Sequence, residues 1–123
     1  MILVDTSVWI EHLRRREARL VAALNDGLVR IHPCIIGEIA LNSLRQRELI
    51  LGALNAIPPV TVATDGEVYA LIEAKRLCGL GIGFADAHLL AALRLTPGVR
   101  LWTLDKRLAA VANRLGLGAP SSN

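Results

Sequence analysis

Met1-Ile2-Leu3-Val4-Asp5-Thr6-Ser7 is the stretch that decides the fold, because a short apolar run ends abruptly in an acid and two hydroxyls. Such a run, followed by polar residues, is typical of a buried strand in a parallel sheet. Asp5 then stands at the carboxyl end of the strand, where ligand sites form in open α/β sheets. Asp5 alone is a weak signal, since Asp also caps helices. Whether Asp5 belongs to a functional site therefore depends on the other acids of the chain.

The rest of the chain alternates between strand and helix patterns. Further short strands are predicted at residues 28–31, 60–63 and 99–103. Helices are predicted over residues 8–13, 17–25, 35–44, 48–56, 64–78, 84–95 and 105–115. Alternation of this kind indicates a parallel sheet with helices on both faces. We expect an α/β fold in a single domain over residues 1–123, with a frayed tail from about residue 117.

Composition narrows the class of protein. The chain is 53% hydrophobic, with a mean hydropathy of +0.44. No stretch has the ~20 apolar residues that a membrane-spanning helix needs. No basic region precedes the first apolar run, so we expect no signal peptide, no membrane segment and a cytoplasmic location. The apolar surplus indicates surface that is covered by a partner, either a second copy or another protein.

Charge and cysteine usage are also informative. The net charge is +3 with a pI of about 9.4, and all but two of the fourteen basic residues are Arg, whose planar fork suits phosphate. Nucleic acid is therefore a plausible partner. The chain has four aromatic residues, too few for a protein that stacks successive bases on aromatic platforms. Cys34 and Cys78 are expected to be buried, reduced thiols, with neither a zinc site nor a disulfide.

Four of the eleven acids are hard to explain as solvated or turn residues. Asp5 and Asp105 each follow a predicted strand, so they lie at the same edge of a parallel sheet. Glu38 interrupts a largely apolar helix, where an unpaired carboxylate is costly. Asp86 lies near the start of a helix rich in Leu and Ala. Helix capping would explain Asp86 or Asp105 taken singly, but it explains the four acids poorly as a set.

Four carboxylates that share one cleft repel one another, and some of them would have to take up protons. A divalent cation removes this repulsion. A set of oxygen ligands suits Mg²⁺ or Mn²⁺, which retain several waters and also bind phosphate oxygens. Such ions can activate water and hold both the attacking and the leaving oxygens during phosphodiester cleavage.

Four segments of the chain resemble the acidic motifs of PIN-domain ribonucleases. They are Val4-Asp5-Thr6-Ser7, Gly37-Glu38-Ile39, Ala85-Asp86-Ala87-His88-Leu89-Leu90-Ala91-Ala92 and Trp102-Thr103-Leu104-Asp105. The size of the chain and the order of the motifs are similar to those of the VapC toxins of type II toxin–antitoxin systems. The resemblance implies a PIN-like three-layer sandwich. Its short, mostly parallel central sheet would have four to five strands, flanked by about seven helices.

The same resemblance implies a metal-dependent endoribonuclease that hydrolyses RNA phosphodiester bonds with Mg²⁺ or Mn²⁺. Its catalytic acids would be Asp5, Glu38, Asp86 and Asp105. Asp5 and Asp86 would be direct metal ligands, whereas Glu38 and Asp105 would bind directly or through water. A metal-held water would attack the phosphorus in line and leave a 5′-phosphate and a 3′-hydroxyl. The resemblance also implies a homodimer and a VapB-like antitoxin that lies over the groove and blocks the site.

Supporting roles are less sharply indicated. Thr6 either orients Asp5 or caps a helix, and both interpretations stay open. Ser7 and Thr103 are further candidates for supporting the site. Lys106 and Arg107, beside the last acid of the set, are candidates for contacts with RNA phosphates.

One position departs from the family pattern. The family often has Ser or Thr three residues before the second acid, where this chain has Ile35. That hydroxyl caps a helix, so its loss affects local geometry more than chemistry. The histidines share no ligand spacing, so we expect surface or capping roles for His12, His32 and His88.

Two other functions remain open at this stage. An acid after the first strand also suits a phosphatase or phosphotransferase that forms an aspartyl phosphate. The usual phosphatase pattern has a second Asp two residues later, where this chain has Ser7. The other possibility is a non-catalytic RNA- or protein-binding module of the same fold.

Overall fold

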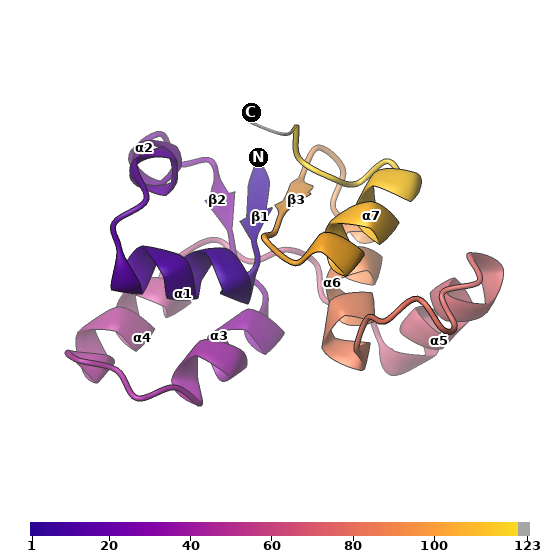
Figure 1. Ribbon diagram of the computed structural model, residues 1–123, viewed down its shortest axis with the longest axis horizontal. Helices are drawn as coiled ribbons and strands as arrows, with labels where there is room; N and C mark the ends of the chain where they lie inside the picture. The colour runs from indigo at the N-terminus through magenta and orange to yellow at the C-terminus, as the bar shows by residue number, and fades with distance from the viewer. Residues whose placement is uncertain (121–123) are drawn as a thin grey trace.

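A three-stranded parallel sheet forms the centre of the protein in a computed structural model that describes residues 1–120. Its strands are β1 (Ile2–Val4), β2 (Val29–Arg30) and β3 (Arg100–Trp102), in the order β2-β1-β3. The first strand of the chain is thus the central one, and Leu3 is paired with Arg30 on one side and Leu101 on the other. The three carboxyl ends point the same way (Figure 1).

Seven helices surround the sheet within the described part of the chain. They are α1 (Thr6–Arg14), α2 (Ala18–Asn25), α3 (Pro33–Ala40), α4 (Arg47–Asn55), α5 (Asp65–Ala74), α6 (Phe84–Leu95) and α7 (Lys106–Arg114). Figure 1 shows α1 to α4 on the β2 side of the molecule and α5 to α7 on the β3 side. The predicted α/β fold is confirmed, including its parallel sheet and its number of helices.

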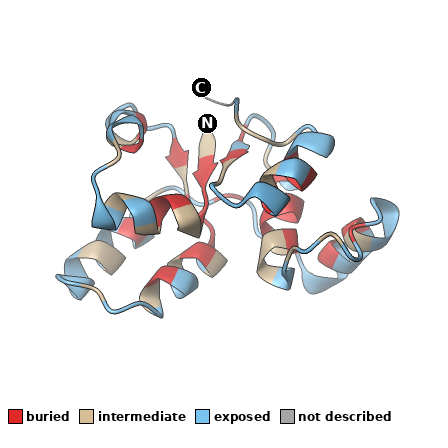
Figure 2. Cartoon of the chain, in the orientation of Figure 1, coloured by how far each residue is buried: buried red, intermediate tan, exposed pale blue. Residues whose placement is uncertain are grey.

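The core lies between the sheet and the inner faces of the helices (Figure 2). Leu3 and Val4 of the central strand are fully buried, as are Leu20 of α2, Ile35 of α3 and Leu90 of α6. Burying one such side chain stabilises the fold by about 1.5–3 kcal/mol. The strand that ends in Asp5 is therefore held rigidly on both faces.

The sheet is smaller than the four to five strands expected. Residues 60–63 form no strand, and this segment is joined to the sheet only by an isolated bridge between Ile31 and Pro59. The Val60 N–H donates to the Ile31 carbonyl at 2.9 Å. Pro58 and Pro59 have no N–H to donate, so a longer ladder cannot form at that edge.

The expected fraying from residue 117 was also wrong for the first residues of the tail. The Leu101 N–H donates to the Leu117 carbonyl at 2.8 Å, and the Ala119 N–H donates to the Leu101 carbonyl at 2.7 Å. The tail therefore lies along the outer edge of β3, where it forms an isolated bridge at Gly118. Residues 121–123 lie outside the described residues.

Two helices end before the predicted residues. α3 ends at Ala40 instead of residue 44, and α5 ends at Ala74 instead of residue 78. Arg76 adopts a left-handed conformation with φ +53°, which stops α5. The resulting loop leaves Cys78 exposed, and Cys34 is only half-buried, so the expectation of two buried thiols was wrong; both are free. None of the described helices is long and apolar enough to cross a membrane.

Candidate metal and catalytic site

Asp5 is fixed at the junction of β1 and β3. Its side chain is 6% exposed, and its N–H donates to the Trp102 carbonyl at 2.9 Å, which extends the pairing of the two strands. Its Oδ2 accepts hydrogen bonds from the hydroxyls of Ser7 at 2.8 Å and Thr103 at 2.6 Å. The three predicted residues Asp5, Ser7 and Thr103 are therefore in direct contact.

Thr6 joins this group to α3. Its hydroxyl donates to Glu38 Oε1 at 2.7 Å, across the packed helices α1 and α3. Asp5 occupies the N-cap position of α1, where its side chain makes no capping hydrogen bond. The Thr6 hydroxyl thus contacts a second acid of the site. Glu38 itself is exposed, so the cost that was expected for an unpaired carboxylate in a largely apolar helix does not arise.

Asp86 and Asp105 both have the capping roles that were considered for them. Asp105 caps α7, because its Oδ1 accepts from the backbone N–H groups of Arg107 at 2.9 Å and Leu108 at 3.1 Å. Asp86 Oδ2 accepts from the Gly83 N–H at 3.0 Å at the start of α6. Each cap uses only one oxygen of its carboxylate, so capping does not prevent a second role.

All four acids share this pattern. In each carboxylate one oxygen accepts the hydrogen bonds described above, and the other accepts none from the described residues. The unpaired oxygens are Asp5 Oδ1, Glu38 Oε2, Asp86 Oδ1 and Asp105 Oδ2. The paired oxygen fixes the orientation of each group, and the unpaired one remains available to a ligand.

The pKa of Asp86 is affected by the other three acids. Burial raises the pKa of Asp86 above its ordinary value, and the negative charges of Asp5, Asp105 and Glu38 raise it further. The hydrogen bond from Gly83 acts in the opposite direction and offsets part of this rise. Three carboxylates at once thus affect a fourth, which is the repulsion that a bound cation would relieve.

The donor set fits a hard divalent cation. Every unpaired donor in the group is a carboxylate oxygen, the ligand type that Mg²⁺ and Mn²⁺ prefer. Over residues 1–120, no three His, Cys, Asp or Glu side chains come close enough together to hold an ion by themselves. An ion at this position would therefore complete its shell with water or phosphate oxygens, which is the usual habit of Mg²⁺ in proteins.

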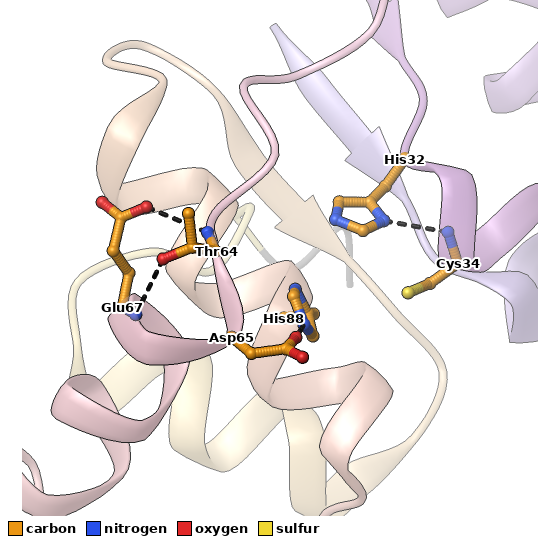
Figure 3. A network of polar contacts seen from close by, with 6 residues as sticks. All are labelled: His32, Cys34, Thr64, Asp65, Glu67 and His88. Atoms are coloured by element: carbon orange, nitrogen blue, oxygen red, sulfur yellow. Dashed lines mark hydrogen bonds and ion pairs between the residues drawn. The ribbon is translucent and has the colours of Figure 1, made fainter.

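Two histidines, His32 and His88, belong to a network of polar contacts that also includes Asp65 and Cys34 (Figure 3). His32 is 1% exposed, and its Nδ1 accepts from the Cys34 N–H at 2.9 Å, so Nε2 carries the ring proton. His88 Nε2 lies 2.8 Å from Asp65 Oδ1. His32 Nε2 and His88 Nδ1 are buried with no partner among the described residues, and the two ring centroids are 6.0 Å apart.

His32 also explains the unusual residue at position 35. It caps α3 by the bond to the Cys34 N–H, and Pro33 follows it at the first position of the helix. Ile35 is fully buried in the core. The capping role predicted for His32 is confirmed, whereas the alternative of a surface role was wrong. His12 also has a capping contact, because its Nδ1 accepts from the Glu17 N–H at 3.0 Å.

Lys106 and Arg107 are exposed in the first turn of α7, directly after Asp105. The Arg107 side chain lies against the loop before α6, because a Cβ added to Gly81 would be 2.6 Å from Arg107 Cδ. Neither side chain forms an ion pair with another described residue. Both cations therefore lie beside the acids without being neutralised by them.

The sequence did not reveal a second feature beside the site. The Arg19 guanidinium lies over the Trp102 ring, 4.9 Å from its centroid. Both residues line a cavity of about 760 Å³ that also includes Thr103. Arg19 and Trp102 lie on different elements far apart in the chain, and no spacing rule connects them.

Comparisons with known proteins identify the family. Residues 2–114, which include all four acids, match the PIN domain family. Ribonuclease VapC32 from each of two strains of Mycobacterium tuberculosis is 49% identical over 117 residues. These alignments cover 95% of this chain and 94% of the relative.

Proposed function

Because the chain belongs to the PIN-domain family and is of the VapC type, we propose that it is an endoribonuclease that hydrolyses RNA phosphodiester bonds with Mg²⁺ or Mn²⁺. One observation carries the proposal. Four carboxylates from α3, α6 and the ends of β1 and β3 approach one another, each with one oxygen fixed by the chain and one oxygen unpaired.

Each residue has a role in this proposal. Asp5 and Asp86 are the direct metal ligands, and Glu38 and Asp105 bind directly or through water. A bound divalent cation supplies Lewis acidity to the phosphoryl oxygen and lowers the pKa of water. The hydroxyls of Ser7 and Thr103 hold Asp5 in one orientation, and that of Thr6 holds Glu38.

The neighbouring cations complete the site. Lys106 and Arg107 bind phosphates that flank the cleaved bond, because exposed cations beside an acidic cluster offset its repulsion of the RNA backbone. The expected products carry a 5′-phosphate and a 3′-hydroxyl.

The proposal extends to partners. The protein acts in the cytoplasm as a homodimer, and a VapB-like antitoxin covers the site. Large apolar side chains on the surface support a partner, since Leu41 is 89% exposed and Leu49 is 67% exposed. Tyr69 and Phe84 form another exposed pair, with ring centroids 5.8 Å apart. Phe84 is two residues from Asp86, so a partner on this pair would lie next to the acids.

The test is cleavage of single-stranded RNA by purified protein with and without Mg²⁺ or Mn²⁺. Asp5→Asn and Asp86→Asn should each reduce the rate by about 100-fold or more, because even the partners of metal ligands typically matter by 10–100-fold. Asp26→Asn, at an exposed turn, is the matched control and should retain full activity. Equal cleavage by the wild type and either site variant would refute the proposal.

The same preparations test the other two functions. Trapping by fluoroberyllate at Asp5 would indicate an aspartyl-phosphate enzyme. The sequence disfavours this, because the residue two positions after Asp5 is Ser7 and not the second Asp of the usual phosphatase pattern. Absence of metal binding by calorimetry would indicate a non-catalytic module.

A further inference from the structure

A cavity of about 760 Å³ lies beside β3, between α2, α7 and the tail of the described chain. Its floor includes Ile2 and Trp102 from β1 and β3, and its walls include Arg19 of α2 and Asn113 of α7. This volume is within the range of small-molecule binding sites. The cavity is large enough for one nucleotide.

The cavity offers one aromatic face. Trp102 is half-buried, and the planar guanidinium of Arg19 already lies over its ring at 4.9 Å, so a flat group can occupy this position. Arg19 is 51% exposed and its ion pair with Glu17 is 3.4 Å long. Exposed pairs of this kind are weak, so Arg19 is free to leave the ring and contact a phosphate.

A second cation lies in the same cavity. Arg100 lines it and is anchored by hydrogen bonds from its Nη1 to the carbonyls of Gly116 at 3.2 Å and Gly118 at 3.4 Å. Its position is thus fixed by the tail that runs beside β3. Two arginines and one indole face form a combination that suits a base with its attached phosphate.

The cavity and the acidic site share a residue. Thr103 lines the cavity, and its hydroxyl donates to Asp5 Oδ2 at 2.6 Å. Trp102 immediately precedes Thr103, and its carbonyl accepts from the Asp5 N–H. A ligand on the Trp102 face therefore lies one residue along β3 from the groups that hold Asp5.

We propose that this cavity binds the base of the RNA nucleotide next to the cleaved phosphodiester, with the base on Trp102 and its phosphate at Arg19 or Arg100. The inference rests on the proposed ribonuclease function and deepens it by naming a substrate subsite. A single aromatic face accommodates one base, which agrees with the scarcity of aromatics in the chain. Base identity at this one position contributes to the sequence preference of the enzyme.

The direct experiment measures nucleotide binding without metal. AMP, GMP, CMP and UMP are titrated separately into the full chain while tryptophan fluorescence is followed. At least one should cause a saturable change, because stacking alters the emission of Trp102, whereas Trp9 is buried in the core. The fluorescence change should be absent in Trp102→Leu. Calorimetry should still detect nucleotide binding to Trp102→Phe, because Phe retains a stacking face.

The matched pair for the phosphate contact is Arg19→Ala and Arg94→Ala. Both variants lose one exposed arginine on a helix, but Arg94 lies at the far end of α6 from Asp86. Arg19→Ala should weaken nucleotide binding and raise the KM for RNA by about tenfold, the lower range for loss of one such contact. Arg94→Ala should change neither value.

The outcomes separate this inference from the proposed function. If the wild type cuts RNA and Asp86→Asn does not, but Trp102→Leu and Arg19→Ala keep both the wild-type KM and the wild-type base preference, the subsite is refuted and the ribonuclease stands. If nucleotides bind through Trp102 but no RNA is cut with either metal, the ribonuclease is refuted. Absence of any nucleotide effect on Trp102 also overturns the subsite.

Discussion

At the scale of single residues, the site depends on how each carboxylate divides its two oxygens. One oxygen accepts a hydrogen bond that belongs to the fold, such as the Thr6 hydroxyl at Glu38 or the Gly83 N–H at Asp86. The second oxygen stays unpaired at the cost of mutual repulsion. The acids are therefore oriented before any ligand arrives, and we expect the free energy of this arrangement to depend on pH and on a bound divalent cation.

Asp86→Asn should stabilise the metal-free protein at pH 7. The pKa of Asp86 is raised by burial and by neighbouring charges, so the folded chain holds this proton more tightly than the unfolded chain. The contribution of Asp86 to stability is therefore complete below its unfolded pKa and is lost as the pH rises through the folded pKa. Asn keeps the acceptor for Gly83 without the charge, and we expect a gain of about 0.5 kcal/mol.

Denaturant unfolding of the two proteins at pH 3 and pH 7 measures this effect. The difference should vanish at pH 3, and saturating Mg²⁺ should reverse it at pH 7, because the wild type then gains binding free energy. Asp26→Asn is the control for simple loss of an exposed charge. A variant that is less stable than the wild type at pH 7 without metal would contradict the interpretation.

His32 should make the protein sensitive to mild acid. Burial and the nearby His88 lower the pKa of His32 from 6.5 to about 4. The unfolded chain takes up this proton below pH 6.5, whereas the folded chain does not until about pH 4. Stability is therefore lost between these two values, by at most about 3 kcal/mol.

His32→Asn tests this prediction, because Asn can still cap α3 with its side-chain oxygen. The variant is expected to lose less stability than the wild type between pH 6.5 and 4, measured as the change in unfolding free energy with pH. His12→Asn, which also replaces a ring that accepts a backbone N–H, is the control. If the unfolding free energy of His32→Asn fell as steeply with decreasing pH as that of the wild type, another group would cause the acid sensitivity.

At the scale of the elements, hydrophobic periodicity and capping signals were enough to predict all seven helices. The Thr64 and Glu67 pair predicted its helix start well, because both halves of the capping box are local in sequence. The helix ends were less predictable. The left-handed Arg76 that stops α5 has no signal of its own, and the sheet pairing of residues 117–119 depends on a strand elsewhere in the chain.

The candidate site, like the helices, could be predicted from the sequence only in part. Asp5 and Asp105 could be proposed because each follows a strand, and Asp86 because it lies near a helix start, whereas Glu38 was proposed from its apolar neighbours and the family motif. The contacts between Thr6 and Glu38 and between Trp102 and Arg19 could not be predicted, because each joins two elements whose packing decides the geometry. The exposure of Glu38 was missed for this reason.

Two substitutions of Asp105 can separate its role as a helix cap from the role proposed for its charge in catalysis. Asp105→Asn keeps a side-chain oxygen for the N–H groups of Arg107 and Leu108, whereas Asp105→Ala removes the cap. Thermal unfolding should show that the Asp105→Ala protein is less stable than the Asp105→Asn protein by about 1 kcal/mol. Both variants should lose RNA cleavage to a similar extent. If Asn retained full activity, the charge of Asp105 would have no part in the reaction.

At the scale of the whole molecule, the net charge is +3, and we expect it to favour RNA binding mainly through the cations near the acids. Lys106→Ala should weaken binding of RNA of any sequence and reduce the slope of log K against log salt by about 1. Arg94→Ala serves as the distant control. The measurement is binding of labelled RNA to the Asp86→Asn protein over a range of salt concentrations. A slope that is the same for Lys106→Ala and the parent would remove Lys106 from the interface.

The central position of β1 has a consequence for the synthesis of the protein. Asp5 is made well before the Thr103 hydroxyl that holds it, because the two residues are 98 positions apart in the chain. The sheet cannot close around β1 until β3 has emerged from the ribosome, and contacts this distant in sequence form late in folding. A growing chain that stops before Asp105 thus carries no complete set of acids. If the four acids act together as proposed, the nascent chain therefore cannot cleave RNA until Asp105 has been made and β3 has paired with β1.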